Sequence, residues 1–240
     1  MAEESRFRQR KPYQEKSWTA FKAESSWQIF KIMSEFVDGF EQLNRIGPCI
    51  SVYGSARTKP GSELYETTVE LGRRLAEEGF GVITGGGPGI MEAANKGAHE
   101  AGGKSVGVGI DLPNEQGSND FIDRDKLVTC NYFYIRKVML FRYAQGFVYM
   151  PGGFGTLDEL SEALTLIQTH KIAQLPVILY GKNYWSKLLE FFADTLRDDY
   201  STINPDDMKL MKVVDSVDEV IDIICDFYAP EEKHSLGPNF

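Results

Sequence analysis

The fold of this chain is decided by the stretch Phe147-Val148-Tyr149-Met150-Pro151-Gly152-Gly153-Phe154-Gly155-Thr156-Leu157-Asp158-Glu159. Four apolar residues predict a buried strand, the glycines predict a turn, and a helix follows. Backbone N–H groups at such a junction between a strand and a helix bind phosphate. Because the stretch ends in carboxylates, it predicts an anion site and an acid/base group in one segment, as in an enzyme that acts on a nucleotide.

The same succession of apolar strands and helices runs through most of the chain. The expected strands are residues 49–53, 80–84, 106–110, 126–130, 147–150, 176–180 and 212–214, and the expected helices are residues 26–43, 64–75, 90–101, 134–144, 157–169, 185–195 and 217–227. Strands that are apolar on both faces and alternate with helices indicate a parallel sheet covered on both sides. We therefore predict an α/β fold with a Rossmann-like, doubly wound, mostly parallel sheet and helices on both faces.

Three turns rich in glycine or serine follow predicted strands. They are Gly54-Ser55, Gly85–Gly89 and Gly152–Gly155. In a parallel sheet, ligands bind beyond the carboxyl ends of the strands, where the strand order reverses. We therefore expect all three turns to line one edge of the sheet.

The chain divides into four predicted parts. Residues 1–17 are expected to be a flexible tail, 18–48 an N-terminal helical extension, 49–229 the nucleotide-binding catalytic domain and 230–240 a C-terminal tail. The helix expected at 26–43 is apolar over a wide arc, so it should pack on the main body or on a partner subunit.

The bulk composition excludes some functions. A formal net charge of -9 disfavours general binding to nucleic acid or to anionic membranes. No run approaches the length of a membrane span, and the three scattered cysteines suit buried thiols in a reducing compartment. We expect a cytoplasmic protein.

Two familiar nucleotide-binding patterns are broken. The dinucleotide pattern G-x-G-x-x-G would need glycine where Ile90 stands, and a P-loop ending at Gly103-Lys104-Ser105 would need glycine where Ala98 stands. The three histidines lack metal-ligand spacing. Neither a metal nor a cofactor is expected.

Two charged motifs are candidates for chemistry. Thr156 is placed to cap the following helix, and Asp158 and Glu159 would then fall in its first turn, where helix stability alone could explain them. Adjacent residues point about 100° apart on a helix, so only one of the two acids should face a ligand, with Glu162 as a reserve candidate.

The pair Arg136-Lys137 begins a helix, where cations oppose the helix dipole and so favour an anionic partner. The aromatic run Tyr132-Phe133-Tyr134 is more typical of core than of base stacking.

The motifs together resemble one known family. Tyr53–Arg57, the run Gly85–Glu92, the pair Arg136-Lys137 and the run Pro151–Glu159 are similar to the "Lonely Guy" (LOG) proteins. That family comprises cytokinin-activating phosphoribohydrolases and bacterial nucleotide 5'-monophosphate nucleosidases, many formerly labelled "possible lysine decarboxylase". The resemblance implies hydrolysis of the N-glycosidic bond of AMP or an N6-modified AMP to free base and ribose 5-phosphate.

The resemblance also implies roles for particular residues. Arg136 and Glu159 would be the catalytic pair. The other candidate residues, expected to bind substrate or its phosphate, are Ser55, Arg57, Gly86, Gly87, Glu115, Lys137, Gly152, Gly153, Phe154, Gly155, Thr156 and Thr165. A homodimer or higher homo-oligomer is implied, with the N-terminal extension as a departure from the family pattern.

Other functions remain open from the sequence. A non-catalytic nucleotide sensor would need the same loops but not the carboxylate of Glu159. A lysine decarboxylase would normally need pyridoxal phosphate on a lysine, and no lysine here has a convincing setting. A carrier of molybdenum cofactor is a further alternative, taken from proteins of similar fold.

Overall fold

The structure is a computed structural model that describes residues 18–111, 117–229 and 236–240, with side chains from residue 25 onward. The helices are α1 (Trp18–Leu43), α2 (Glu63–Glu77), α3 (Ile90–Glu100), α4 (Phe133–Arg142), α5 (Phe154–Gln168), α6 (Lys182–Glu190) and α7 (Val217–Tyr228). The strands are β1 (Cys49–Tyr53), β2 (Gly81–Thr84), β3 (Ser105–Ile110), β4 (Leu127–Cys130), β5 (Ala144–Tyr149), β6 (Val177–Tyr180) and β7 (Met211–Val214).

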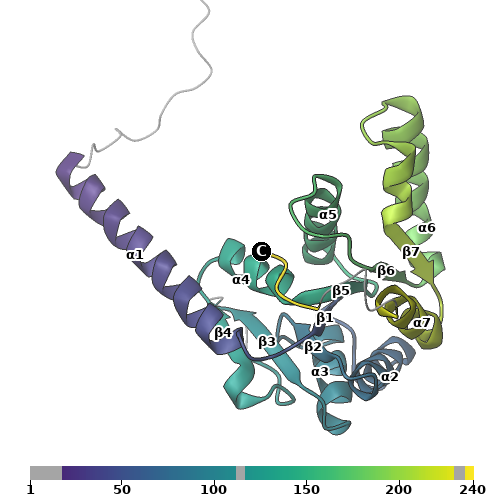
Figure 1. Cartoon of the computed structure of the whole chain (residues 1–240), viewed down its shortest axis with the longest axis horizontal. Coiled ribbons are helices and arrows are strands. Elements are labelled where there is room, and N and C mark those ends of the chain that lie inside the picture. Colours follow the sequence, from purple (N-terminus) through teal and green to yellow (C-terminus); the bar gives the residue numbers. More distant parts are fainter. Residues whose placement is uncertain (1–17, 112–116, 230–235) are drawn as a thin grey trace, which may run out of the picture.

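All seven strands lie in one parallel sheet (Figure 1). Their order is β4-β3-β2-β1-β5-β6-β7, so the order reverses at β1, which pairs with β2 on one side and β5 on the other. The predicted doubly wound parallel fold is confirmed. The reversal brings the turns after β1 and β5 next to each other, although more than ninety residues separate them.

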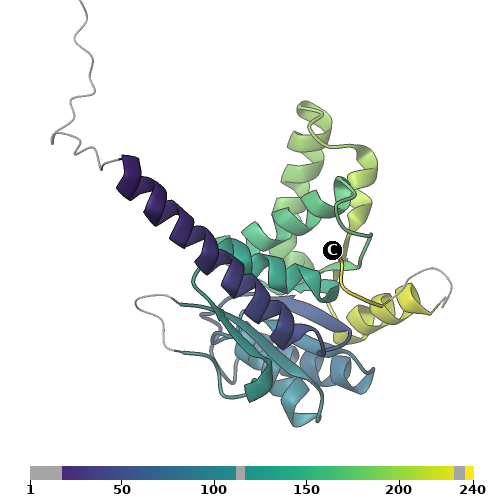
Figure 2. The same cartoon turned by 60° about the vertical axis from the view of Figure 1, so that its left-hand side comes forward.

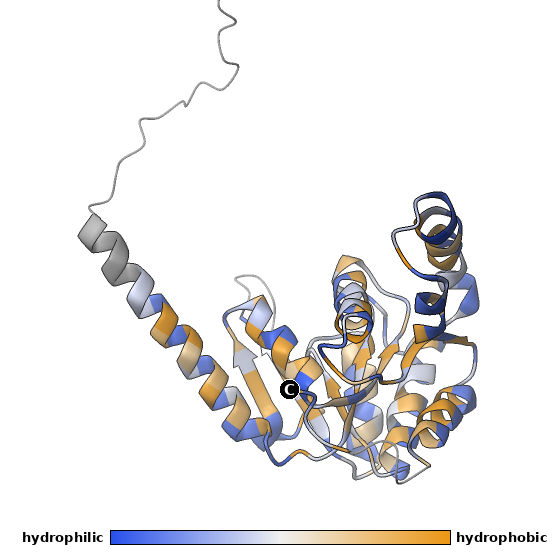
Figure 3. Ribbon diagram, turned by 45° about the horizontal axis from the view of Figure 1, so that its top comes forward, coloured by the Kyte–Doolittle hydropathy of each residue, from blue (hydrophilic) through white to orange (hydrophobic). Residues whose placement is uncertain are grey.

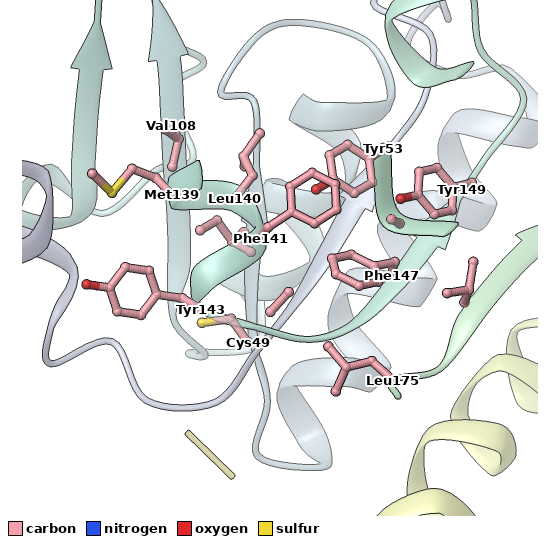
Figure 4. Packing of buried hydrophobic residues seen from close by; sticks show 14 of the residues in the cluster. Cys49, Tyr53, Val108, Met139, Leu140, Phe141, Tyr143, Phe147, Tyr149 and Leu175 are labelled. Atoms are coloured by element: carbon pink, nitrogen blue, oxygen red, sulfur yellow. The ribbon is translucent and has the colours of Figure 1, made fainter. Parts of the chain in front are cut away.

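The strands β1, β2, β5 and β6 contribute alternate residues to two cores. In β5, Phe147 and Tyr149 face one side of the sheet and pack with α4 and α5. Val148 faces the other side and packs with α2, α3 and α7, as does Met150, which directly follows the strand. Figure 4 shows the first core, in which Tyr53 and Tyr149 stack with ring centroids 4.9 Å apart. Helices therefore cover both faces of the sheet, as expected.

Two predicted boundaries near the decisive stretch are wrong. β5 begins at Ala144 rather than at Phe147, because Ala144 pairs with Cys49 in the sheet. α5 begins at Phe154 with Gly153 as its N-cap residue, so Thr156 is not the cap. Asp158 and Glu159 consequently lie beyond the first turn. The cause is local, since the glycine turn itself continues into the helix.

Helix α1 starts at Trp18, earlier than the expected helix, and extends beyond the body of the molecule (Figures 1 and 2). Near its carboxyl end Phe36, Phe40 and Leu43 pack into the first core. Apolar residues recur along the helix beyond that contact (Figure 3). Those more than half exposed are Trp27, Ile29, Phe30, Met33 and Val37. Only some of the apolar residues of α1 therefore pack on the body of the molecule, and the others are exposed.

The described part of the predicted C-terminal tail is bound to the domain. Asn239 donates from its backbone N–H to the Arg142 carbonyl at 2.8 Å, and from its side chain to the carbonyls of Phe141 at 2.7 Å and Ala144 at 2.8 Å. Gln145 and Gly237 are joined by hydrogen bonds in both directions. Residues 236–240 therefore lie against the carboxyl end of α4 and donate hydrogen bonds to carbonyl groups there. Within the described ranges, none of the helices combines the length and apolar character that a membrane crossing requires.

Candidate active site

A cleft of about 1310 Å³ lies at the carboxyl ends of β1, β2, β3 and β5. All three predicted turns line it, which confirms that they share one edge of the sheet. Of the predicted site residues, the lining includes Ser55, Arg57, Gly86, Gly87, Arg136, Gly152, Gly153, Phe154, Gly155, Thr156 and Glu159.

Arg136 reaches the cleft from the first half of α4. Its Nε donates to the Val108 carbonyl at 3.0 Å, which fixes the guanidinium beside the end of β3. A Cβ atom at Gly85 would lie 2.0 Å from Nη2 of Arg136, so only glycine allows this close approach. The first glycine turn and Arg136 therefore form one unit, in which the guanidinium can meet an anion bound in the cleft.

Glu159 reaches the cleft from α5. Burial raises the pKa of its carboxyl group to about 7, with Arg136 opposing the rise and Asp158 adding to it. No ion pair joins Glu159 to Arg136 in the described structure, and the Glu159 backbone carbonyl accepts from the Tyr149 hydroxyl at 3.1 Å. A carboxyl group that titrates near neutral pH can exchange a proton with a substrate or a water molecule.

The second glycine turn is held by a tyrosine that the sequence did not single out. The Tyr184 hydroxyl, from α6, donates a hydrogen bond to the Gly152 carbonyl and lines the cleft. Phe154 is 92% exposed at the rim. No side chain caps the start of α5, so the first N–H groups of this helix are available to an anion.

Two other predicted site residues, Lys137 and Thr165, lie elsewhere. Lys137 does not line the cleft and instead bridges Asp158 at 3.1 Å and Glu162 at 2.7 Å. Thr165 is exposed on α5 and donates to the Ser161 carbonyl at 2.8 Å. Glu115 lies outside the described residues. Glu162, the reserve acid, is engaged by Lys137, so Glu159 is the carboxylate of α5 that reaches the cleft.

The position of Phe133 contradicts the expectation that the aromatic run Tyr132-Phe133-Tyr134 lies in the hydrophobic core. It is 53% exposed and lines the cleft, while Tyr132 and Tyr134 stack with centroids 5.3 Å apart. Consecutive residues on a helix point about 100° apart, so three adjacent aromatic residues cannot all face the core. That rule predicts that part of the run lies outside the core, but it does not single out Phe133. Nothing in the sequence around Tyr184 distinguishes it from an ordinary surface tyrosine.

Metal ligation has no candidate in the described residues. No group of three or more histidine, cysteine, aspartate or glutamate side chains there could hold a metal ion. The polar groups that line the cleft include backbone amides of the glycine turns, the guanidinium groups of Arg57 and Arg136, the carboxyl groups of Asp111 and Glu159, and several hydroxyl groups. This set can bind a phosphate and stabilise a developing positive charge.

Two curated relatives of this chain carry enzyme names. The chain is 32% identical over 136 residues to the probable cytokinin riboside 5'-monophosphate phosphoribohydrolase LOGL5 of Oryza sativa subsp. japonica, an alignment covering 55% of this chain and 54% of the relative. It is 29% identical over 177 residues to the cytokinin riboside 5'-monophosphate phosphoribohydrolase of Mycobacterium tuberculosis, covering 72% and 90%. The chain thus spans about half the length of the rice relative that it matches.

A solved structure has the same fold. The molybdenum cofactor carrier protein MCP from Chlamydomonas reinhardtii superposes with a TM-score of 0.55 at 27% identity, covering 76% of this chain and 99% of that chain. The family model described as "possible lysine decarboxylase" matches residues 91–224. This match covers more than half of the chain and includes Arg136 and the whole second glycine turn, so the chain belongs to that family, the family of the LOG proteins.

Proposed function

We propose that the protein hydrolyses the N-glycosidic bond of purine nucleoside 5'-monophosphates, giving a free base and ribose 5-phosphate. The observation that carries this proposal is that Arg136 and Glu159 line one cleft together with two glycine turns. The names of the rice and mycobacterial relatives support it.

The second glycine turn is the proposed seat of the 5'-phosphate. Residues 152–156 lead directly into α5, whose first N–H groups carry no side-chain cap. Glycines at 152, 153 and 155 let a phosphate approach the backbone, and the helix dipole favours its charge. Glu159 follows on the same helix and also lines the cleft. We propose that it meets the ribose joined to that phosphate.

Cleavage of the bond between ribose and base develops positive charge at the anomeric carbon. The carboxylate of Glu159 stabilises this charge and accepts a proton from the attacking water. The water oxygen bonds to the anomeric carbon, and the bonding electrons leave with the base, which is then protonated. A pKa of about 7 lets Glu159 act as a base and return the proton at neutral pH.

Arg136 has two proposed roles. Its guanidinium can bind the phosphate with its fork of donors, or it can orient the sugar. The apolar wall that includes Phe133 and Leu127 is the proposed surface for the base. AMP and N6-modified AMP are both candidate substrates, as they differ only at the base.

A panel of nucleoside 5'-monophosphates, assayed for free base by chromatography, tests the proposal. We expect release from AMP or an N6-modified AMP. Glu159→Gln should retain fold and nucleotide binding and lose activity by about 100-fold or more. Glu190→Gln, at an exposed glutamate of α6, is the control. Turnover by Glu159→Gln equal to that of the wild type would exclude the assigned role.

Binding of a nucleotide without release of base from any member of the panel would favour the non-catalytic sensor instead. Release of carbon dioxide from lysine, together with the absorbance of a pyridoxal Schiff base, would favour a decarboxylase. The carrier function named for the Chlamydomonas structure would require binding of molybdenum cofactor.

We also propose a cytoplasmic homodimer or higher homo-oligomer that binds neither nucleic acid nor membranes, in line with the charge of -9. The exposed apolar residues of α1 support self-association, since an isolated chain would leave them in water. Light scattering should give an oligomer for the wild type and a smaller particle for Phe30→Glu. Lys31→Glu, at an exposed polar site on the same helix, is the control. An unchanged mass for Phe30→Glu would remove α1 from the interface.

A further inference from the structure

Asn119, a partly buried residue, holds the first glycine turn by hydrogen bonds. Its side-chain Nδ2 donates to the carbonyls of Gly86 at 3.2 Å and Gly87 at 3.1 Å, and its backbone N–H donates to the Gly86 carbonyl at 2.8 Å. Gly86 and Gly87 line the cleft, whereas Asn119 does not. The Asn119 side chain therefore binds the first glycine turn on the side that faces away from the cleft.

A buried polar network supports Asn119. Its Nδ2 also lies 3.1 Å from Oδ1 of Asn95, which is 0% exposed and accepts from the Thr84 hydroxyl at 2.6 Å. Asn95 in turn donates to Ser105 at 2.9 Å. Thr84 accepts from the Gly86 N–H at 3.0 Å. Because buried polar groups of this kind rarely change partners without loss of stability, the network fixes where Asn119 points.

The direction of one peptide group follows from these contacts. In a planar trans peptide the C=O of one residue and the N–H of the next point in opposite directions. The structure describes no cis peptide bonds, so a Gly86 carbonyl turned towards Asn119 requires the Gly87 N–H to point the other way. Gly86 itself has a φ of +74°, a left-handed backbone conformation that favours glycine. No acceptor for the Gly87 N–H is present among the described residues.

We infer that Asn119 is a positioning residue, which fixes the Gly86–Gly87 peptide so that the Gly87 N–H faces the cleft and donates a hydrogen bond to an oxygen of the substrate. This inference rests on the proposed function for the class of substrate, a nucleoside 5'-monophosphate. The guanidinium of Arg136 lies against the neighbouring Gly85. The Gly87 N–H and this guanidinium would therefore contact the same part of the ligand. The turn is thereby organised before the substrate arrives.

Two substitutions of Asn119 distinguish the effect of its side-chain N–H donors from the effect of its side-chain shape. Asn119→Ala removes Nδ2 but keeps the backbone hydrogen bond to Gly86. Asn119→Asp keeps the shape and places a carboxylate oxygen against three oxygen acceptors, which repels the turn. Asp120→Ala, at the exposed neighbour, is the matched control because no hydrogen bond or ion pair of Asp120 is present among the described residues.

The test measures KM and kcat with AMP, and the dissociation constant of AMP in a Glu159→Gln background. We expect Asn119→Ala to raise KM and the dissociation constant by about tenfold, with kcat changed by less than about threefold. Asn119→Asp should raise both further, and Asp120→Ala should match the wild type. A KM and an affinity for Asn119→Ala within about twofold of the wild type would overturn the inference.

A second measurement does not depend on whether the Asn119 variants fold. In Glu159→Gln protein labelled with 15N-glycine, saturating AMP should shift the amide resonance of Gly87 more than that of Gly79, which lies outside the cleft. An unchanged Gly87 resonance overturns the inference. Binding of AMP without release of adenine would refute the proposed hydrolysis alone, and the inference would then be decided by the affinities. A wild-type protein that binds neither AMP nor an N6-modified AMP would refute both.

Discussion

The ammonium group of Lys137 lies 2.7 Å from a carboxylate oxygen of Glu162 and 3.1 Å from one of Asp158. Lys137 follows Arg136 on α4, and the two acids flank Glu159 on α5. The helix carrying the candidate guanidinium is thus joined by ion pairs to the helix carrying the candidate carboxylate. The lysine is 21% exposed, so solvent screens these pairs only in part.

Replacement of Lys137 by methionine should shift the pH dependence of activity. The lysine lowers the pKa of Glu159, whereas Asp158 and Glu162 raise it. Without the lysine, more of the carboxyl group is protonated at neutral pH, and kcat/KM should fall roughly two- to fivefold at about pH 7 and recover at higher pH. Lys137→Arg keeps the charge and should retain the wild-type profile. A uniform loss at every pH would indicate a role in binding instead.

Replacement of Glu159 by glutamine should stabilise the protein in a pH-dependent way. The pKa is raised from 4.5 to about 7 in the folded state, so the folded protein holds this proton more tightly than the unfolded chain. The associated stability is fully present below about pH 4.5 and is lost as pH rises through 7. Glutamine stays neutral, so the gain should grow between about pH 5 and pH 8, reaching about 3 kcal/mol.

Urea unfolding of both proteins at each pH measures this gain. Glu190→Gln, in which an exposed carboxylate is removed, should show no such trend. A gain that is the same at both ends of the pH range would mean that Glu159 titrates as an ordinary carboxylate.

Replacement of Tyr184 by phenylalanine should weaken the second glycine turn. The change removes the hydroxyl that donates to the Gly152 carbonyl, a loss of about 1 kcal/mol. If residues 152–156 hold the 5'-phosphate, KM for AMP should rise about fivefold, with no change for adenosine, which has no phosphate. Steady-state kinetics with both compounds measure this. Tyr200→Phe, at a 72% exposed tyrosine, is the control. Equal effects on AMP and adenosine would argue against the phosphate seat.

Replacement of Asn239 by alanine should destabilise the domain. The side chain donates to the Phe141 and Ala144 carbonyls, and each acceptor would lose one of its donors near the end of α4. We expect a loss of about 1 to 3 kcal/mol in the free energy of unfolding, measured in urea. Asn183→Ala, at an exposed asparagine of α6, should have a much smaller effect. Stability equal to the wild type would show that residues 236–240 contribute little.

The sequence predicted the placement of the glycine turns because that placement depends on local pattern. Short apolar runs followed by glycine and then by helical spacing predict strand, turn and helix wherever they occur, and the parallel sheet follows from their alternation. Helix boundaries were less predictable. Thr156 has the residue type of a helix cap, yet α5 had already begun at Phe154, because the glycine turn continues into helical geometry.

What the sequence by itself determined is the alternation of strands and helices, the edge of the sheet where the turns gather, and the presence of Arg136 and Glu159 near it. Only the tertiary structure decided that β1 lies between β2 and β5, and that Lys137 binds acids of α5 while Phe133 lines the cleft. It also decided that Asn119 grips a turn more than thirty residues away. The reason is that strand order and side-chain partners join residues far apart in the chain, and local periodicity carries no information about such pairs.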